Sequence, residues 1–155
     1  MGVDIRDQLR MDHETALAEL EALRNETEES RCQASLRQMR RAWVIHALAE
    51  ETVVYRALEG VEVAHGKTRA DERFVEHELV EGLFDKLSRS RPGALEWNAR
   101  LNVARELIMR HIDTEHDEVF PQLERRFKPE ELEELGRRFE IARDKLTLLE
   151  EAKAA

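Results

Sequence analysis

Four histidines, each near the middle of a separate helical stretch, constrain this chain more than any other feature. Glutamates follow the second and the fourth of them by four residues, which gives the set His13, His46, Glu50, His77, His111 and Glu115. Four residues turn an α-helix by about 400° and advance it by about 6 Å, so each His-x-x-x-Glu pair places imidazole and carboxylate on one face. Because helices in a bundle bury one stripe, these side chains are expected to converge in a helical core.

The composition favours long helices over strands. Of the 155 residues, 38% are charged and 5% are aromatic, and the chain has three prolines and six glycines. This mixture of alanine, leucine, glutamate and arginine is typical of helices, and the length suits one domain with its own core. We therefore predict an all-α fold.

Apolar residues recur at helical spacing along the chain, and no stretch alternates as a strand would. The predicted helices cover about residues 4–24, 31–59, 68–88, 94–127 and 129 onward. Pro121 lies inside the fourth and should kink it or loosen one turn, whereas Pro129 suits the first turn of the fifth. Short connections predict an antiparallel up-down four-helix bundle over residues 1–127, followed by a C-terminal fifth helix over residues 128–155.

The fifth helix carries an apolar seam of its own. Its positions alternate in steps of three and four, at Leu132, Leu135, Phe139, Ala142, Leu146 and Leu149. Such a seam must be covered. The cover is either the bundle itself or a second copy of the chain, so both a monomer and a homodimer remain open.

Charge and hydropathy exclude several classes of partner. The net charge of −9 argues against a nucleic-acid surface, because phosphate contacts need clustered lysine and arginine. No stretch approaches the ~20 apolar residues of a membrane span, and the N-terminus lacks a secretory signal. Cys32 is the single cysteine, so it forms no internal disulfide. We expect a cytoplasmic protein without nucleic-acid or membrane partners.

The four histidines also fall at similar depths between the predicted helix breaks, so a rise of ~1.5 Å per residue brings them to one level. A single histidine on an apolar face is usually a hydrogen-bonded core residue. Two carboxylates are different, because burying each without a partner costs several kcal/mol and no lysine or arginine shares the inner stripes. A pair of metal ions would satisfy all six side chains at once.

The ligand types limit which metal ions the site could bind. The absence of a thiolate argues against a structural zinc site of the cysteine type, and mixed imidazole and carboxylate suits iron, manganese or zinc. Carboxylates from two helices can bridge ions about 3.5–4 Å apart. Glu81, four residues after His77, is either a further carboxylate ligand or a half-exposed residue beside the core. Tyr55 is a further ligand candidate, although an undistorted helix turns it away from the site.

Beyond these six residues, the sequence resembles the hemerythrin-like, or HHE cation-binding, family over about residues 10 to 145. The similar segments are HALAEETVVYRAL, EHELVEGLFDKL, HIDTEHDEVFPQL and KPEELEELGRRFE. The resemblance implies a four-helix bundle around a non-haem diiron centre with an oxo or hydroxo bridge. It also implies that His13 and His46 hold one iron, His77 and His111 hold the other, and Glu50 and Glu115 bridge them.

This chain departs from the oxygen-carrying hemerythrins, which have two histidines four residues apart in the third helix and a His-x-x-x-x-Asp in the fourth. Here Glu81 stands four residues after His77, and the last motif is His-x-x-x-Glu. One fewer imidazole favours the ferric state and leaves a coordination position open. We expect a protein that binds or reacts with dioxygen, peroxide or nitric oxide, in stress response or in oxygen or iron sensing. The alternatives are a peroxide-decomposing or oxidase enzyme and a metal-dependent regulatory module.

Overall fold

The computed structural model describes residues 2–59 and 68–155, with side chains from residue 72 onward in the second segment. The predicted break from Gly60 to Gly66, which includes His65, lies outside these residues. The described chain is helical, and its elements are α1 (Ile5–Asn25), α2 (Glu29–Glu50), η1 (Glu51–Tyr55), α3 (Thr68–Ser88), α4 (Leu95–Thr114), η2 (Glu115–Val119), α5 (Phe120–Arg126) and α6 (Pro129–Ala154).

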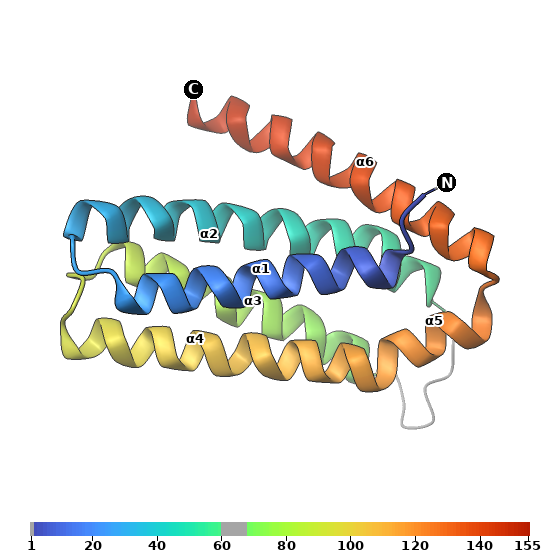
Figure 1. Ribbon diagram of the computed structural model, residues 1–155, viewed down its shortest axis with the longest axis horizontal. Coiled ribbons are helices and arrows are strands. Elements are labelled where there is room, and N and C mark those ends of the chain that lie inside the picture. Colours follow the sequence, from blue (N-terminus) through green and yellow to red (C-terminus); the bar gives the residue numbers. More distant parts are fainter. Residues whose placement is uncertain (1, 60–67) are drawn as a thin grey trace.

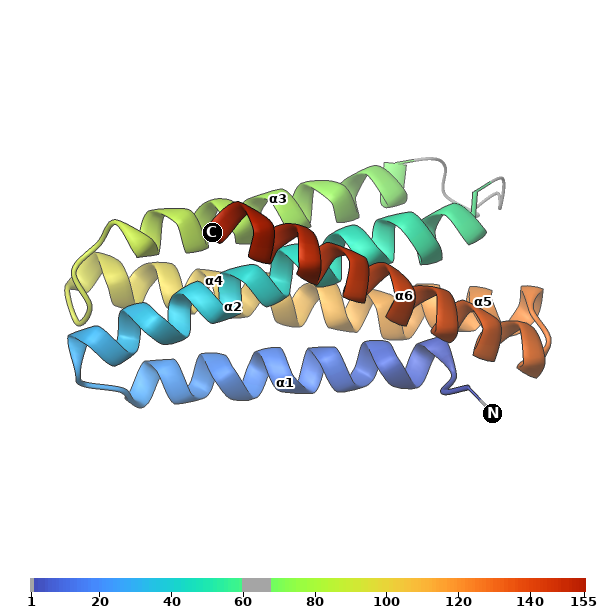
Figure 2. The ribbon, with the colours of Figure 1, turned by 90° about the horizontal axis from the view of Figure 1, so that it is seen from above.

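The four long helices α1 to α4 lie side by side and alternate in direction, and α6 crosses over α1 and α2 (Figure 1; Figure 2). The predicted all-α bundle with a fifth helix is therefore confirmed. Asp4 starts α1 by accepting a hydrogen bond from the Arg6 backbone N–H at 2.8 Å, as an N-cap should. The connection from α3 to α4 contains Gly93, whose φ of 80° suits a residue without Cβ.

Two apolar clusters form the core, one on either side of the level at which the histidines lie. The first fills the half of the bundle near the α1–α2 and α3–α4 connections, with Leu20, Leu36, Phe84, Trp97, Leu101 and Ile108. The second lies toward α5 and under α6, with Ile5, Leu9, Val54, Leu123, Leu132 and Phe139. His13 stands between Leu9 and Leu20 along α1, so the polar level is enclosed by apolar layers.

Helix α6 packs on the bundle through its first half. An added Cβ at Gly136 would lie 2.0 Å from the Val3 carbonyl oxygen, so the absence of a side chain allows the N-terminal segment to approach α6. Of the predicted seam, Leu149 is 58% exposed. The other seam residues contact the second apolar cluster, and they are Leu132, Leu135, Phe139, Ala142 and Leu146.

Two π-helical turns interrupt the bundle near the polar level. η1 follows Glu50 directly, and η2 begins at Glu115. A π-turn closes hydrogen bonds from residue i to i+5, so it adds one residue to the turn and rotates the next part of the helix about its axis. Pro121, which has no N–H to donate, stands just after η2. The predicted loosening of one turn near Pro121 is confirmed. Across the described residues, no helix is long and apolar enough to span a membrane.

Candidate metal centre

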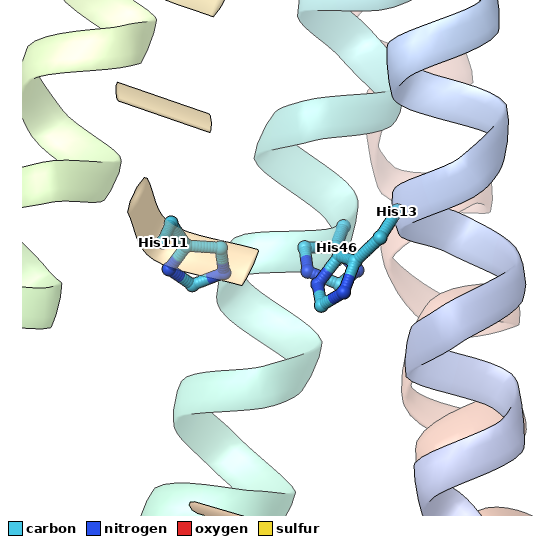
Figure 3. A group of neighbouring side chains, drawn as sticks. All are labelled: His13, His46 and His111. Atoms are coloured by element: carbon cyan, nitrogen blue, oxygen red, sulfur yellow. The ribbon is translucent and has the colours of Figure 1, made fainter. Parts of the chain in front are cut away.

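Six polar side chains from α1, α2, α3, α4 and η2 meet between the two apolar clusters. None of them is more than 5% exposed, and they are His13, His46, Glu50, His77, His111 and Glu115. Figure 3 shows three of the imidazoles, from α1, α2 and α4, at one level of the bundle. The side chains that the sequence predicts to converge are therefore brought together.

Glu50 lies between three imidazoles. Its Oε2 atom is 3.2 Å from Nε2 of His77, 3.6 Å from Nε2 of His111 and 3.8 Å from Nε2 of His46. These histidines belong to three different helices. One carboxylate thus contacts both of the histidine pairs that the family resemblance assigns to separate ions.

Glu115 occupies a matching place on the other side of the cluster. Its Oε2 atom is 3.2 Å from Nε2 of His13, and its Oε1 atom is 3.7 Å from Nε2 of His111. The two oxygens of this carboxylate therefore face imidazoles from different pairs. A carboxylate placed in this way has the arrangement that bridging of two cations requires.

Many of the buried nitrogen and oxygen atoms of these six side chains have no hydrogen-bond partner within the chain. They include both nitrogens of His13 and His111, Nε2 of His46 and His77, Oε1 of Glu50 and Oε2 of Glu115. Leaving a buried polar atom unpaired costs about 1–3 kcal/mol. In two groups, potential ligand atoms lie within 4.8 Å of one another, namely His13 with His46 and His111, and Glu50 with His77 and His111. This donor set fits bound cations.

Outer carboxylates orient two of the imidazoles. Nδ1 of His46 lies 3.0 Å from Oδ2 of Asp12, and Nδ1 of His77 lies 2.8 Å from Oε1 of Glu51. Such contacts fix the ring so that Nε2 faces the centre of the cluster, as is usual for metal-ligating histidines. Arg143 of α6 hydrogen-bonds Asp12 and ties the fifth helix to this shell.

Sequence reasoning missed part of this outer shell. Asp12 is adjacent to His13 in sequence but hydrogen-bonds a histidine of a different helix, so no spacing along one helix reveals it. Glu76 is buried beside His77 in sequence, yet it lies 3.8 Å from Nδ1 of His111 and 3.1 Å from Nε of Arg110. Both contacts depend on how neighbouring helices pack.

Tyr55, which an ideal helix would turn away, reaches the cluster. Its hydroxyl donates to Oε2 of Glu50 at 3.1 Å and lies 3.4 Å from Oε1 of Glu115. The π-turn η1 places residue i+5 above residue i, so Tyr55 stands over Glu50. Burial raises the pKa of Tyr55 well above its usual range, so the phenol keeps its proton.

Arg73 is a buried cation on the inner stripe of α3, so the expectation that no lysine or arginine shares the inner stripes is wrong. Only 5% of it is exposed, its guanidinium carbon lies 5.7 Å from the centre of the Tyr55 ring, and it pairs with Glu118 at 3.5 Å. This places a positive charge behind the tyrosine that contacts both carboxylates.

Glu81 does not join the cluster. Its side chain is 47% exposed and lies 3.9 Å from the Arg40 guanidinium on α2. Glu78 and His116 are exposed as well. The placement of Glu81 matches the second of the two alternatives predicted for it, a half-exposed glutamate beside the core, and contradicts the ligand role.

The histidines of the cluster differ in the direction in which their pKa is shifted. Burial lowers the pKa of His13 to about 3, and the neighbouring His46 acts in the same direction. Burial also opposes the charge on His77, but the nearby carboxylates of Glu50 and Glu51 outweigh this and raise its pKa to about 9. Burial would raise the pKa of Glu50, yet the imidazoles of His77 and His111 beside it hold this pKa well below its usual range.

Metal binding is therefore expected to release about one proton per chain at neutral pH, from His77. Because its pKa is about 9, His77 is charged below that pH in the metal-free protein and must lose its proton to ligate. Apparent affinity should accordingly rise with pH up to about 9. Calorimetric titration of the metal-free protein in buffers of different ionisation enthalpy measures the proton count. A count near zero at pH 7, or an unchanged count in Glu51→Gln, contradicts the assignment.

Comparison with known proteins agrees with this geometry. A curated protein of Nostoc sp. (strain PCC 7120 / SAG 25.82 / UTEX 2576), named DNA nickase, is 23% identical over 144 residues, which cover 93% of this chain. The chain spans 40% of the length of that relative. No solved structure matches the chain. The family model described as hemerythrin HHE cation binding domain matches residues 4–123, and the chain therefore belongs to this cation-binding family.

Proposed function

We propose that the chain holds two iron ions between its six buried ligands and that this centre binds or reacts with dioxygen, peroxide or nitric oxide. His13 and His46 would serve one ion, and His77 and His111 the other. The observation that carries the proposal is the position of Glu50 and Glu115, because each lies within 4 Å of imidazoles from both pairs. When bound, the ions would supply redox chemistry and a coordination position for the small ligand.

The ligand count supports a reactive centre. Four imidazoles and two shared carboxylates give each ion two nitrogen and two oxygen donors. Iron with such ligands commonly takes more donors than this, so positions remain for a small ligand. Apolar clusters lie on both sides of the site and lower its polarity, which strengthens electrostatic interactions inside it. Zinc and manganese share the same ligand preferences, so the identity of the metal is itself part of the test.

A second candidate, peroxide decomposition or oxidation, is favoured by Tyr55. Its phenol retains a proton at Oη and donates it toward Oε2 of Glu50. A hydrogen-bonded phenol next to both carboxylates can deliver or hold a proton during a reaction, which simple reversible carriage does not need. Arg73 behind the ring would stabilise negative charge on Tyr55 when the proton moves.

The activity named for the Nostoc relative is not carried over to this chain. The match covers 40% of that protein. The net charge of −9 disfavours contact with a phosphate backbone. A regulatory role, in which metal loading sets the affinity for a partner, is supported by no specific contact among the described residues.

The proposal is tested by metal analysis and an optical spectrum of protein produced in iron-rich medium. We expect about two iron ions per chain, as in other carboxylate-bridged bundles, with absorption in the near ultraviolet. Peroxide is then added while oxygen release is followed. Sustained turnover favours the enzyme, and a stable coloured adduct favours a carrier or sensor. Protein that retains no iron after anaerobic reconstitution contradicts the proposal.

A further inference from the structure

A cavity of about 300 Å³ lies beside the metal centre, between α1, α2 and α6. His13 and His46 form part of its wall, so it reaches the histidine pair assigned to one ion. Helix α6 crosses over α1 and α2 (Figure 2). Arg143 and Thr147 of α6 line the cavity. The cavity is thus adjacent to the ligands without being one of their coordination positions.

The cavity is much larger than the small ligands considered so far. An apolar cavity of about 150 Å³ accommodates benzene, so about 300 Å³ leaves room for a molecule of two fused rings. Dioxygen, peroxide or nitric oxide would fill only a small fraction. Pockets that bind organic molecules commonly begin at about this volume.

The inner wall is apolar and aromatic. Met39, Phe84 and Ile108 line it together with Trp43, and all four are buried. The Trp43 ring lies 5.9 Å from the His46 ring, centre to centre, so a molecule in contact with Trp43 is one ring away from the metal ligands. This wall suits a planar apolar ligand.

The polar residues of the cavity set its charge preference. Asp12, Glu19 and Asp144 are acidic, and among the described residues of the wall Arg143 is the one lysine or arginine. Arg143 is engaged by its hydrogen bond to Asp12 and by the Phe139 ring, 5.5 Å away. The remaining negative charge opposes an anionic ligand.

From these three features we propose that the cavity binds a neutral, mainly apolar organic molecule of about two rings next to His13 and His46. Its binding follows from cavity shape and charge. Its role as a reaction partner of the metal centre rests on the proposed function.

Indole is a suitable probe, and indole-3-acetate is its anionic counterpart. Calorimetric titration of the protein as isolated should show indole binding at one site per chain. We expect about tenfold weaker binding of indole-3-acetate, because the acidic wall repels its carboxylate. Absence of indole binding, or equal or tighter binding of the anion, overturns the proposal.

Substitutions that place a larger side chain in the cavity test whether indole binds there. Ala16→Leu on α1 and Ala42→Leu on α2 extend into the cavity from different walls and should each weaken indole binding by about tenfold or more. Ala18→Leu, an exposed position of α1 outside the cavity, is the matched control and should leave binding unchanged. If indole binds equally tightly to both filled variants and to the control, it does not bind in this cavity.

Measurement of the iron content distinguishes a failure of this inference from a failure of the proposed function. None of the three alanines is a ligand, so iron content should be the same in all variants. Indole binding that responds to Ala16→Leu in a protein that retains no iron after anaerobic reconstitution would support the cavity and contradict the diiron proposal.

Discussion

Replacing His111 with alanine is expected to remove both metal ions rather than one. His111 belongs to both groups of potential ligands, and its Nε2 atom lies within 4 Å of both Glu50 and Glu115. Its loss would leave one ion short of a ligand and both carboxylates without one of their neighbouring imidazoles. Metal analysis should fall from about two ions per chain to a small fraction of that, because outer and inner ligands act together.

The matched control is His116→Ala. His116 lies on the same helical run, five residues beyond His111, but is exposed. Its replacement should leave metal content unchanged. Circular dichroism of both variants checks that the helices persist. Full metal retention in folded His111→Ala protein would contradict the ligand assignment.

Removal of the metal is expected to lower the midpoint of thermal unfolding by about 10–20 °C. An ion present at a hundred times its dissociation constant stabilises the folded state by about 2.7 kcal/mol, so two ions give about 5 kcal/mol. Each kcal/mol shifts the midpoint of a chain of this size by about 2–4 °C. The effect should be large here because the metal-free centre leaves buried imidazoles and carboxylates unpaired.

Calorimetric scans with and without a chelator measure this shift. His111→Ala is the control, since a chain that holds no metal should unfold at the same temperature in both scans. An unchanged midpoint for the unaltered chain, with metal loss verified, would mean that the polar cluster is stable without cations and would remove the energetic reason for a metal centre.

The buried stripe of each helix explains why two glutamates reach the centre and a third does not. In α2 the stripe advances from Trp43 by three residues to His46 and then by four to Glu50. In α4 it likewise advances by three from Ile108 to His111 and by four to Glu115. In α3 the step after His77 is three, to Val80, so Glu81 lies at the edge of the stripe and meets Arg40 instead. On α3 the buried residue four positions from His77 is Arg73, which precedes His77 in the sequence.

The sequence by itself determined the helices, their order and the six residues that converge. Helical periodicity is a local property, and His-x-x-x-Glu pairs share a face in any α-helix. Comparable depths within four antiparallel helices then bring the faces to one level, because the rise per residue is constant.

The tertiary structure alone decided what surrounds these six residues. Tyr55 reaches Glu50 because the π-turn η1 rotates it toward the cluster, and the local sequence does not predict that turn. Asp12 orients His46 across a helix interface, and α6 closes the cavity beside them. Contacts between helices depend on their relative rotation and crossing, which are set by the packing of the whole core and not by the spacing along any one helix.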